Sequence, residues 1–208
     1  FHCDVRAGEP EVQWQERIVE KVGPIENSFQ LGPHKVTVSL SAEPLLESEF
    51  DIRLRADFLE EAPRDILAGV RSALLETAEV GFLGKGSLVG VLFEIHSLEY
   101  TQDVNISMIK KACADAVLIL LKQAKIVLYE PYMALHLECP VEFAGVVTND
   151  IQSRQGKIKE IGGDGKTHSL EAEVPLKEFF GYSTSVRSIS KGTAVYDLRL
   201  VGFKKQIV

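Results

Sequence analysis

A helical repeat of apolar residues is the clearest pattern in the chain. Apolar residues recur at spacings of three and four from Ile109 to Ala124, and charged residues such as Asp115 occupy positions between them. This spacing predicts an amphipathic helix with one face in a core. Cys113 lies on the apolar face, so we expect a buried thiol and not a nucleophile.

Shorter patterns predict the other elements of the first part. Residues 36–41 and 89–95 alternate apolar and polar side chains, which is the period of a half-buried strand. A helix is predicted to begin near Pro63 and to end before Gly81, because apolar residues recur at helical spacing between them. Weaker strand patterns cover residues 12–22 and 50–54.

The second part reads as strand, helix, strand, strand, helix, strand. Residues 133–137 alternate as in a strand, residues 143–151 have helical spacing, and a hairpin is predicted to turn at Gly162-Gly163-Asp164-Gly165. A helix is predicted to begin at Pro175, and residues 194–200 alternate again. This order is that of a ferredoxin-like, split βαβ domain, so the expected fold class is α+β.

The composition is that of a folded protein with an uneven charge. The chain has 208 residues, 45% of them apolar and 25% charged, and a formal charge of −7. Residues 1–129 hold 13 Lys or Arg against 20 Asp or Glu, whereas residues 130–208 hold 10 of each. Affinity for a phosphate backbone comes mainly from lysine and arginine. Any nucleic-acid contact of the acidic first part should therefore be local.

Several classes of protein are disfavoured. No apolar stretch approaches the roughly 18 residues that span a bilayer, so we expect a soluble protein. The three cysteines, Cys3, Cys113 and Cys139, are too widely spaced for a disulfide framework or a Cys-x-x-Cys site, which favours a reducing compartment. The chain opens at Phe1 with no initiator methionine and no signal-peptide pattern, so we interpret it as a fragment of a longer protein.

Candidate chemistry is sparse. The loop from Gly81 to Ser87 is rich in glycine, but Gly84-Lys85 is followed by Gly86 and lacks the spacing of a phosphate-binding P-loop. None of the five histidines forms an i, i+4 helical pair, and no nucleophile elbow is present. We therefore predict no catalytic residue, no bound cofactor and no metal site in this chain.

Four motifs in the second part carry a specific resemblance. Along the chain they are Glu130-Pro131-Tyr132-Met133, Asp150-Ile151-Gln152-Ser153-Arg154-Gln155-Gly156, Val174-Pro175-Leu176-Lys177-Glu178-Phe179-Phe180-Gly181-Tyr182-Ser183-Thr184-Ser185-Val186-Arg187-Ser188 and Lys191-Gly192. Their order and spacing resemble the last domain of elongation factor G. Upstream, residues 5–16 are similar to that family's exit from its third domain, and residues 36–45 and 107–129 to its fourth.

The resemblance implies a division into three parts and a set of partners. Residues 1–10 are then a remnant of the preceding domain, residues 11–129 an elongated βαβ domain like the family's fourth, and residues 130–208 the ferredoxin-like C-terminal domain. The implied parent is a translational GTPase whose GTP and Mg are bound by domains that precede this chain. The implied partners are those N-terminal domains, ribosomal RNA of the decoding region and of the large subunit, tRNA and mRNA. The implied location is the cytoplasm or an organelle, with no membrane contact.

Two loops of the fourth-domain-like part match the family's tip loops, which enter the decoding region. The matching residues are Gln30, Leu31, Gly32, Pro33 and His34 in the first tip loop and Glu99, Tyr100, Thr101 and Gln102 in the second. The first tip loop departs from the family's glycine-rich pattern, and its proline stiffens it. In the second, the family's Tyr-His-x-x-Asp-Ser-Ser run is aligned so that Tyr100 stands at the histidine position. A tyrosine can stack on a base but cannot carry a positive charge.

The last domain also contains candidates for contact with RNA or with another domain. They are Arg154, Tyr182 and Arg187. The pattern places Phe179 and Phe180 in the core and Gly181 in the middle of a helix. Close approach of that helix to the sheet is the simplest explanation for a glycine there.

Translocation of tRNA and mRNA is the first functional hypothesis. The altered tip loops leave open a paralogue that recycles ribosomes or protects them from an antibiotic, as in tetracycline resistance. A third hypothesis is a pair of αβ modules that contact protein or RNA away from the ribosome. Sugar and mevalonate-type kinases share a βαβ architecture, but their Gly/Ser-rich phosphate loop has no counterpart here. We therefore expect no change in melting temperature when ATP or GTP is added.

Overall fold

The computed structural model describes residues 12–45, 52–55 and 62–206, which divide into two compact units. Residues Trp14–Tyr129 form the N-terminal unit, and residues 130–206 belong to the C-terminal unit. Strand β7 (Ile126–Pro140) contributes residues to both. The predicted remnant at residues 1–10 lies outside the described residues, and the assignment of residues 11–129 to a fourth domain stays a prediction.

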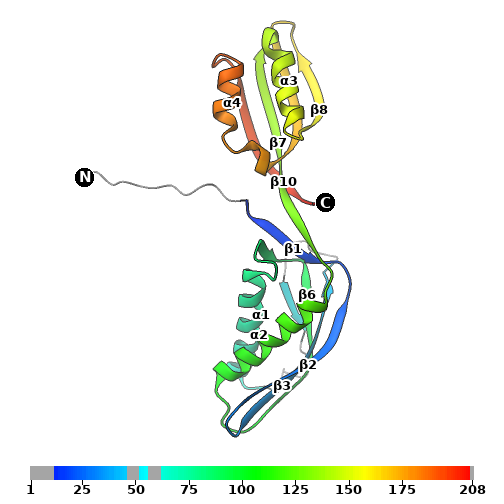
Figure 1. Ribbon diagram of the computed structural model, residues 1–208, viewed down its shortest axis with the longest axis vertical. Coiled ribbons are helices and arrows are strands. Elements are labelled where there is room, and N and C mark those ends of the chain that lie inside the picture. The colour runs from blue at the N-terminus through cyan, green and yellow to red at the C-terminus, as the bar shows by residue number, and fades with distance from the viewer. Residues whose placement is uncertain (1–11, 46–51, 56–61, 207–208) are drawn as a thin grey trace, which may run out of the picture. The chain divides into compact units, whose positions relative to one another are not determined.

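The N-terminal unit is built around a four-stranded sheet that two helices cover on one face (Figure 1). In spatial order, its strands are β2 (Val22–Leu31), β3 (His34–Pro44), β6 (Val91–Tyr100) and β4 (Ile52–Arg55). β2, β3 and β6 are antiparallel neighbours, whereas β4 runs parallel to β6. A parallel pair needs a long crossover, and α1 (Arg64–Val80) lies between these two strands in the chain. α2 (Ile106–Gln123) follows β6.

A second set of strands completes the N-terminal unit. β1 (Trp14–Ile18) pairs in parallel with β5 (Gly86–Leu88) and antiparallel with residues 126–129 of β7. The predicted strand at 12–22 is therefore two strands, β1 and the beginning of β2. The run predicted at 89–95 begins two residues later, because Val89 and Gly90 precede β6. The prediction at 50–54 is partly outside the described residues, and β4 covers its end.

The core of the N-terminal unit lies between the sheet and the two helices. The strongly periodic residues meet there, with 0% exposure for Val36, Val38, Leu40, Ile109, Cys113, Val117 and Leu120. Both predicted helices are confirmed, as is the buried position of Cys113. Burial raises the pKa of the Cys113 thiol to about 12, so the thiolate is disfavoured.

The C-terminal unit has the predicted split βαβ order. Its sheet runs β10 (Val195–Lys205), β7, β9 (Thr167–Pro175) and β8 (Lys157–Gly163). The helices α3 (Ala144–Ser153) and α4 (Tyr182–Ile189) cover one face (Figure 1), each preceded by a short 3-10 helix, η2 (Val141–Phe143) and η3 (Leu176–Phe179). The α+β class and the ferredoxin-like arrangement are confirmed. In the part of the chain that the structure describes, no helix has the length and apolar character needed to cross a bilayer.

The helix predicted from Pro175 is wrong in one respect, because the chain breaks it into η3 and α4 at Gly181. Gly181 has a φ of +71°, which is left-handed backbone that favours glycine. A Cβ at this position would meet no atom within 4 Å, so close approach to the sheet is not the reason for the glycine. Phe179 is buried in the core as predicted, with 4% exposure. Phe180 is 36% exposed, so its predicted core position is wrong.

Candidate functional site

The two predicted tip loops meet at one end of the four-stranded sheet (Figure 1). The first tip loop contains a tight turn at Gly32-Pro33 between β2 and β3. In the second tip loop, Glu99 and Tyr100 are the last residues of β6, and Thr101 and Gln102 follow them. The Thr101 N–H donates to the Lys35 carbonyl oxygen at 3.1 Å. The Lys35 N–H in turn donates to the Thr101 Oγ1 at 3.1 Å. These two bonds bring the second tip loop next to Lys35, the residue that follows the first tip loop.

The second tip loop is held at both ends. Thr101 bonds Lys35 at its beginning, and Asn105 caps α2 at its end by accepting the Ser107 N–H at 2.9 Å. Between them, Asp103 has a φ of +59°, which allows the chain to reverse over a few residues. Gln102 and Asp103 are exposed at this reversal.

Tyr100 lies at the edge of the core and not at the exposed reversal. Phe29, Val36 and Tyr100 are paired in one row across β2, β3 and β6. Directly paired residues point to the same face, and Val36 is fully buried under the helices. The Tyr100 ring therefore lies on the helix side of the sheet, 40% exposed, whereas Leu31 at the end of β2 is 64% exposed.

The glycine-rich loop after α1 does not fit a nucleotide, because three of its backbone N–H groups already donate hydrogen bonds to a carboxylate. The N–H groups of Phe82 and Leu83 donate to Glu16 at 2.7 and 2.8 Å, and the Lys85 N–H does so at 3.4 Å. Glu16 is fully buried in β1. A phosphate would need the same donors. Among residues 12–45, 52–55 and 62–206, moreover, no group of three or more His, Cys, Asp or Glu could hold a metal ion.

Sequence reasoning missed Glu16 as the partner of this loop. The available signal was an acidic residue inside a strand pattern that precedes a loop rich in glycine. Because 66 residues separate Glu16 from Phe82, no local pattern connects them.

Arg154 holds parts of the C-terminal unit together and does not face outward. Its guanidinium donates to Asp150 Oδ2 at 3.0 Å, to the Glu178 carbonyl at 2.8 Å and to Ser185 Oγ at 2.9 Å. It also lies 5.3 Å from the Tyr182 ring centre. These contacts join α3, η3 and α4 and give Arg154 a structural role, whereas its contact with RNA or another domain stays a prediction.

Tyr182 and Arg187 also differ in their environment. Tyr182 is 1% exposed and packs its ring against Phe179 and Tyr196, with ring centres 4.7 and 5.2 Å apart. Burial raises the pKa of its hydroxyl, and the ring cannot reach a partner outside the unit. Arg187 is exposed on α4, so it remains a candidate for contact.

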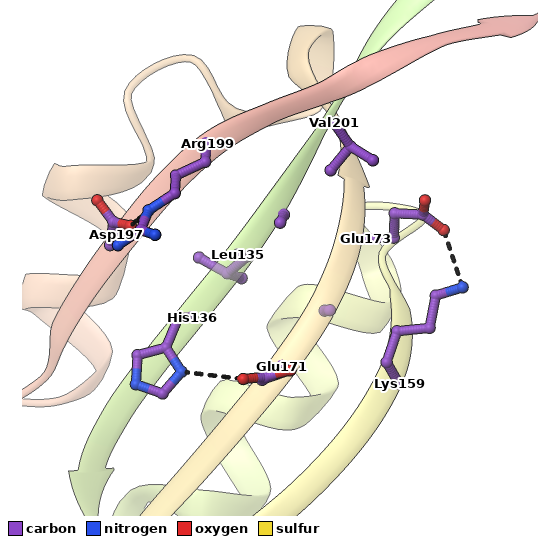
Figure 2. Close-up of a pocket in the computed structure, with 10 residues that line it drawn as sticks. Leu135, His136, Lys159, Glu171, Glu173, Asp197, Arg199 and Val201 are labelled. Atoms are coloured by element: carbon purple, nitrogen blue, oxygen red, sulfur yellow. Dashed lines mark hydrogen bonds and ion pairs between the residues drawn. The ribbon is translucent and has the colours of Figure 1, made fainter.

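The face of this sheet away from α3 and α4 has a shallow hollow of about 420 Å³ (Figure 2). Paired charges line it. Glu173 forms ion pairs with Lys159 and Lys204 at 3.0 and 2.7 Å, and Arg199 forms one with Asp197 at 2.7 Å. These lysines hold the pKa of Glu173 below its usual value. Because each of these cations already faces a carboxylate, the hollow is not an anion site.

Comparisons with known proteins show which family the chain resembles. Residues 127–206 match the family model described as elongation factor G C-terminus. Elongation factor G 1 from Bdellovibrio bacteriovorus is 32% identical over 94% of this chain and 29% of its own length. A crystal structure of a protein from Thermus thermophilus matches 96% of this chain and 30% of its own, with a TM-score of 0.80 and 25% identity.

The chain thus spans less than a third of each of these relatives, and the similarity extends over both of its units. The residues that the family model matches include the whole ferredoxin-like C-terminal unit as the structure describes it. We conclude that residues 127–206 match the C-terminal domain of elongation factor G and that the chain as a whole is similar in sequence to an elongation factor G.

Proposed function

We propose that this chain is the ribosome-binding part of a translational GTPase that promotes movement of tRNA and mRNA. The observation that carries the proposal is 32% identity to an elongation factor G over 94% of the chain. The meeting of both tip loops at one end of the sheet supports it, because a recognition surface needs its parts in fixed proximity.

GTP and Mg belong to the parent protein in this proposal. In the loop from Gly81 to Ser87, the N–H groups of Phe82 and Leu83 are bonded to Glu16, which supports assigning nucleotide binding to other domains of the parent. Hydrolysis of GTP is assigned to domains outside the 29% of the relative that the chain covers. We place the parent in the cytoplasm or an organelle, where ribosomes are found.

The tip contacts RNA by shape and a few polar groups. Residues 1–129 are acidic overall, so counterion release along a phosphate backbone contributes little. Exposed Leu31 and Gln102 are available to stack on or bond to unpaired bases of structured RNA, tRNA or mRNA. Arg187 is the remaining candidate for contact with large-subunit RNA or another domain.

The helix cap offers a second alignment of the family's Tyr-His-x-x-Asp-Ser-Ser run. Asp and Asn are equivalent as helix N-caps, and Asn105 caps α2. Placing the family's aspartate on Asn105 puts its tyrosine on Thr101 and its histidine on Gln102. This alignment moves the functional position from the half-buried Tyr100 to the exposed Gln102.

Two measurements on the full-length parent test the proposal. We expect ribosomes to stimulate its GTP hydrolysis, and we expect it to move mRNA by one codon in a single-turnover assay. Gln102→Ala should slow that movement, whereas Val80→Ala, at an exposed helix end outside the tip loops, should leave it unchanged. A full-length protein without ribosome-stimulated hydrolysis would contradict the proposal and favour a role away from the ribosome.

A recycling or ribosome-protection factor is the second candidate. The tight Gly32-Pro33 turn and the glutamine at the exposed reversal depart from the family's tip pattern, and this departure favours a changed task on the same particle. Splitting of post-termination ribosomes, or restored translation in the presence of tetracycline, would support it. Such a protein would fail to move mRNA.

A further inference from the structure

The second tip loop leaves the sheet at a point where a backbone bond is missing. β6 ends at Tyr100, which pairs with Val36, and the chain then turns toward α2. The Lys35 N–H, one residue before Val36, therefore has no further β6 carbonyl to bond. The hydroxyl of Thr101 takes the place of that carbonyl at 3.1 Å.

We propose that Thr101 is a positioning residue that makes the two tip loops one recognition surface. The Thr101 N–H and Oγ1 bond the two backbone groups of Lys35, the residue that follows the first tip loop, so a single residue extends the contact between β3 and β6 beyond their last ladder pair. A threonine side chain is stiff at χ1, which keeps the acceptor in place. The effect on translation rests on the function proposed above, whereas the coupling of the loops does not.

The surroundings explain why one hydroxyl has this effect. The other end of the second tip loop is fixed by the Asn105 cap, so Thr101 sets where Gln102 lies relative to the Gly32-Pro33 turn. Within the first tip loop, Leu31 and His34 are paired across the hairpin, and the Gln30 side-chain amide donates to the Gly32 carbonyl at 3.2 Å. Without the Thr101 hydroxyl, the Lys35 N–H loses its acceptor, and only the Thr101 N–H still bonds Lys35 beyond the last pair of the β3–β6 ladder.

Amide hydrogen exchange on the 208-residue chain tests the coupling directly. Thr101→Val has the same shape but lacks the acceptor, and we expect the Lys35 amide to exchange about tenfold faster or more. Thr101→Ser keeps a hydroxyl and should leave the rate within about twofold of the original. The matched control is Thr37→Val, since the Thr37 hydroxyl bonds Ser28 at 2.8 Å within the same hairpin and joins no second loop.

Single-turnover movement of mRNA by the full-length protein, at a saturating concentration, tests the role in function. Thr101→Val should slow this step about tenfold, whereas Thr37→Val and Thr101→Ser should not. A role in stability alone would affect Thr101→Val and Thr37→Val equally. Slower mRNA movement by Thr101→Val than by Thr37→Val would therefore show that Thr101 acts by positioning the tip loops.

Unchanged exchange at Lys35 in Thr101→Val would overturn the coupling of the loops. Faster exchange with movement equal to that of Thr37→Val would overturn the positioning role. The proposed function fails if Gln102→Ala also leaves mRNA movement unchanged and ribosomes do not stimulate GTP hydrolysis. Even in that case, the exchange rate of the Lys35 amide in Thr101→Val decides whether the loops are coupled.

Discussion

Leu31 and Gln102 in the N-terminal unit and Arg154 and Tyr182 in the C-terminal unit, all predicted contact residues, have opposite environments. In the N-terminal unit, Leu31 is 64% exposed and Gln102 is exposed at a chain reversal. In the C-terminal unit, Tyr182 is 1% exposed and Arg154 makes three hydrogen bonds inside the unit. The segment with the most specific family motifs is thus mainly structural, while the loops with the looser match are at the surface. A motif match identifies the fold, whereas exposure decides whether a residue can touch a partner.

The N-terminal unit has its own structural anchor, although nothing in its motifs pointed to it. Glu16 uses a buried carboxylate to hold a loop by its N–H groups, and Arg154 uses a guanidinium to hold a segment by a carbonyl and two side chains. Both join elements that are distant in the chain. The difference is that Arg154 has a carboxylate partner, Asp150, while the described partners of Glu16 are backbone amides.

The largest loss of stability is expected when Glu16 is removed. Glu16→Ala leaves three loop N–H groups without their buried acceptor and should lower the free energy of unfolding of the N-terminal unit by about 3 kcal/mol. Trp14, the single tryptophan of the chain, lies in this unit, so its fluorescence during urea unfolding reports the loss. Glu16→Gln retains one acceptor oxygen and should lose about half as much. Equal stability of Glu16→Ala and the original chain would remove Glu16 as an anchor.

The second largest loss of stability is expected when Arg154 is removed, and we expect it in the C-terminal unit only. Arg154→Ala leaves Asp150 and the Glu178 carbonyl without their donor, at an expected cost of about 2 kcal/mol because the site retains some access to water. Faster amide exchange in α4, with unchanged exchange in α2, would show this. Arg187→Ala is the matched control at an exposed arginine. If both variants behaved alike, the contrast between buried and exposed candidates would fail.

A smaller effect is expected at the break between η3 and α4. Gly181→Ala forces a side chain into left-handed backbone and should cost about 1 to 2 kcal/mol in thermal or urea unfolding. Gly181→Asn should be milder, because asparagine tolerates this conformation better. Since a Cβ at Gly181 meets open space, a neutral Gly181→Ala would mean that the φ of +71° is not required.

The cap of α2 is expected to contribute slightly less. Asn105→Ala removes the acceptor of the Ser107 N–H and should lower stability by about 1 kcal/mol. Asn105→Asp should be neutral or slightly stabilising, because a negative charge at a helix N-terminus is favourable. Loss of stability in Asn105→Asp would argue against this cap and against the alignment built on it.

The smallest effects belong to the exposed tip residues. Leu31→Ala and Gln102→Ala should change stability by no more than about 0.5 kcal/mol, because neither side chain is buried. Melting temperatures of Leu31→Ala, Gln102→Ala and Arg154→Ala, measured under the same conditions, would test this difference in stability. A large loss in either tip variant would mean that the tip, like the Arg154 cluster, is mainly structural.

The sequence-based predictions are most accurate where a structure depends on residues that are close together in the chain. The helix at α2 was predicted because each of its turns repeats the same apolar positions, and the hairpin of β8 and β9 because its turn is local. The turn itself lies slightly later than predicted, where Asp164 accepts the Lys166 and Thr167 N–H groups at 3.0 and 2.8 Å. The break at Gly181 was missed because helical spacing continues through it.

The sequence by itself determined the two-part organisation of the patterns, the amphipathic helices and the family motifs, because each of these is a matter of local order along the chain. Only the tertiary structure decided that Arg154 points inward, that Glu16 fills the glycine-rich loop and that Thr101 joins the tip loops. Periodicity tells which face of an element is buried, but it does not tell which distant backbone group a polar side chain will meet. That choice depends on how strands and helices pack, and it is what separates a structural residue from one that can touch a partner.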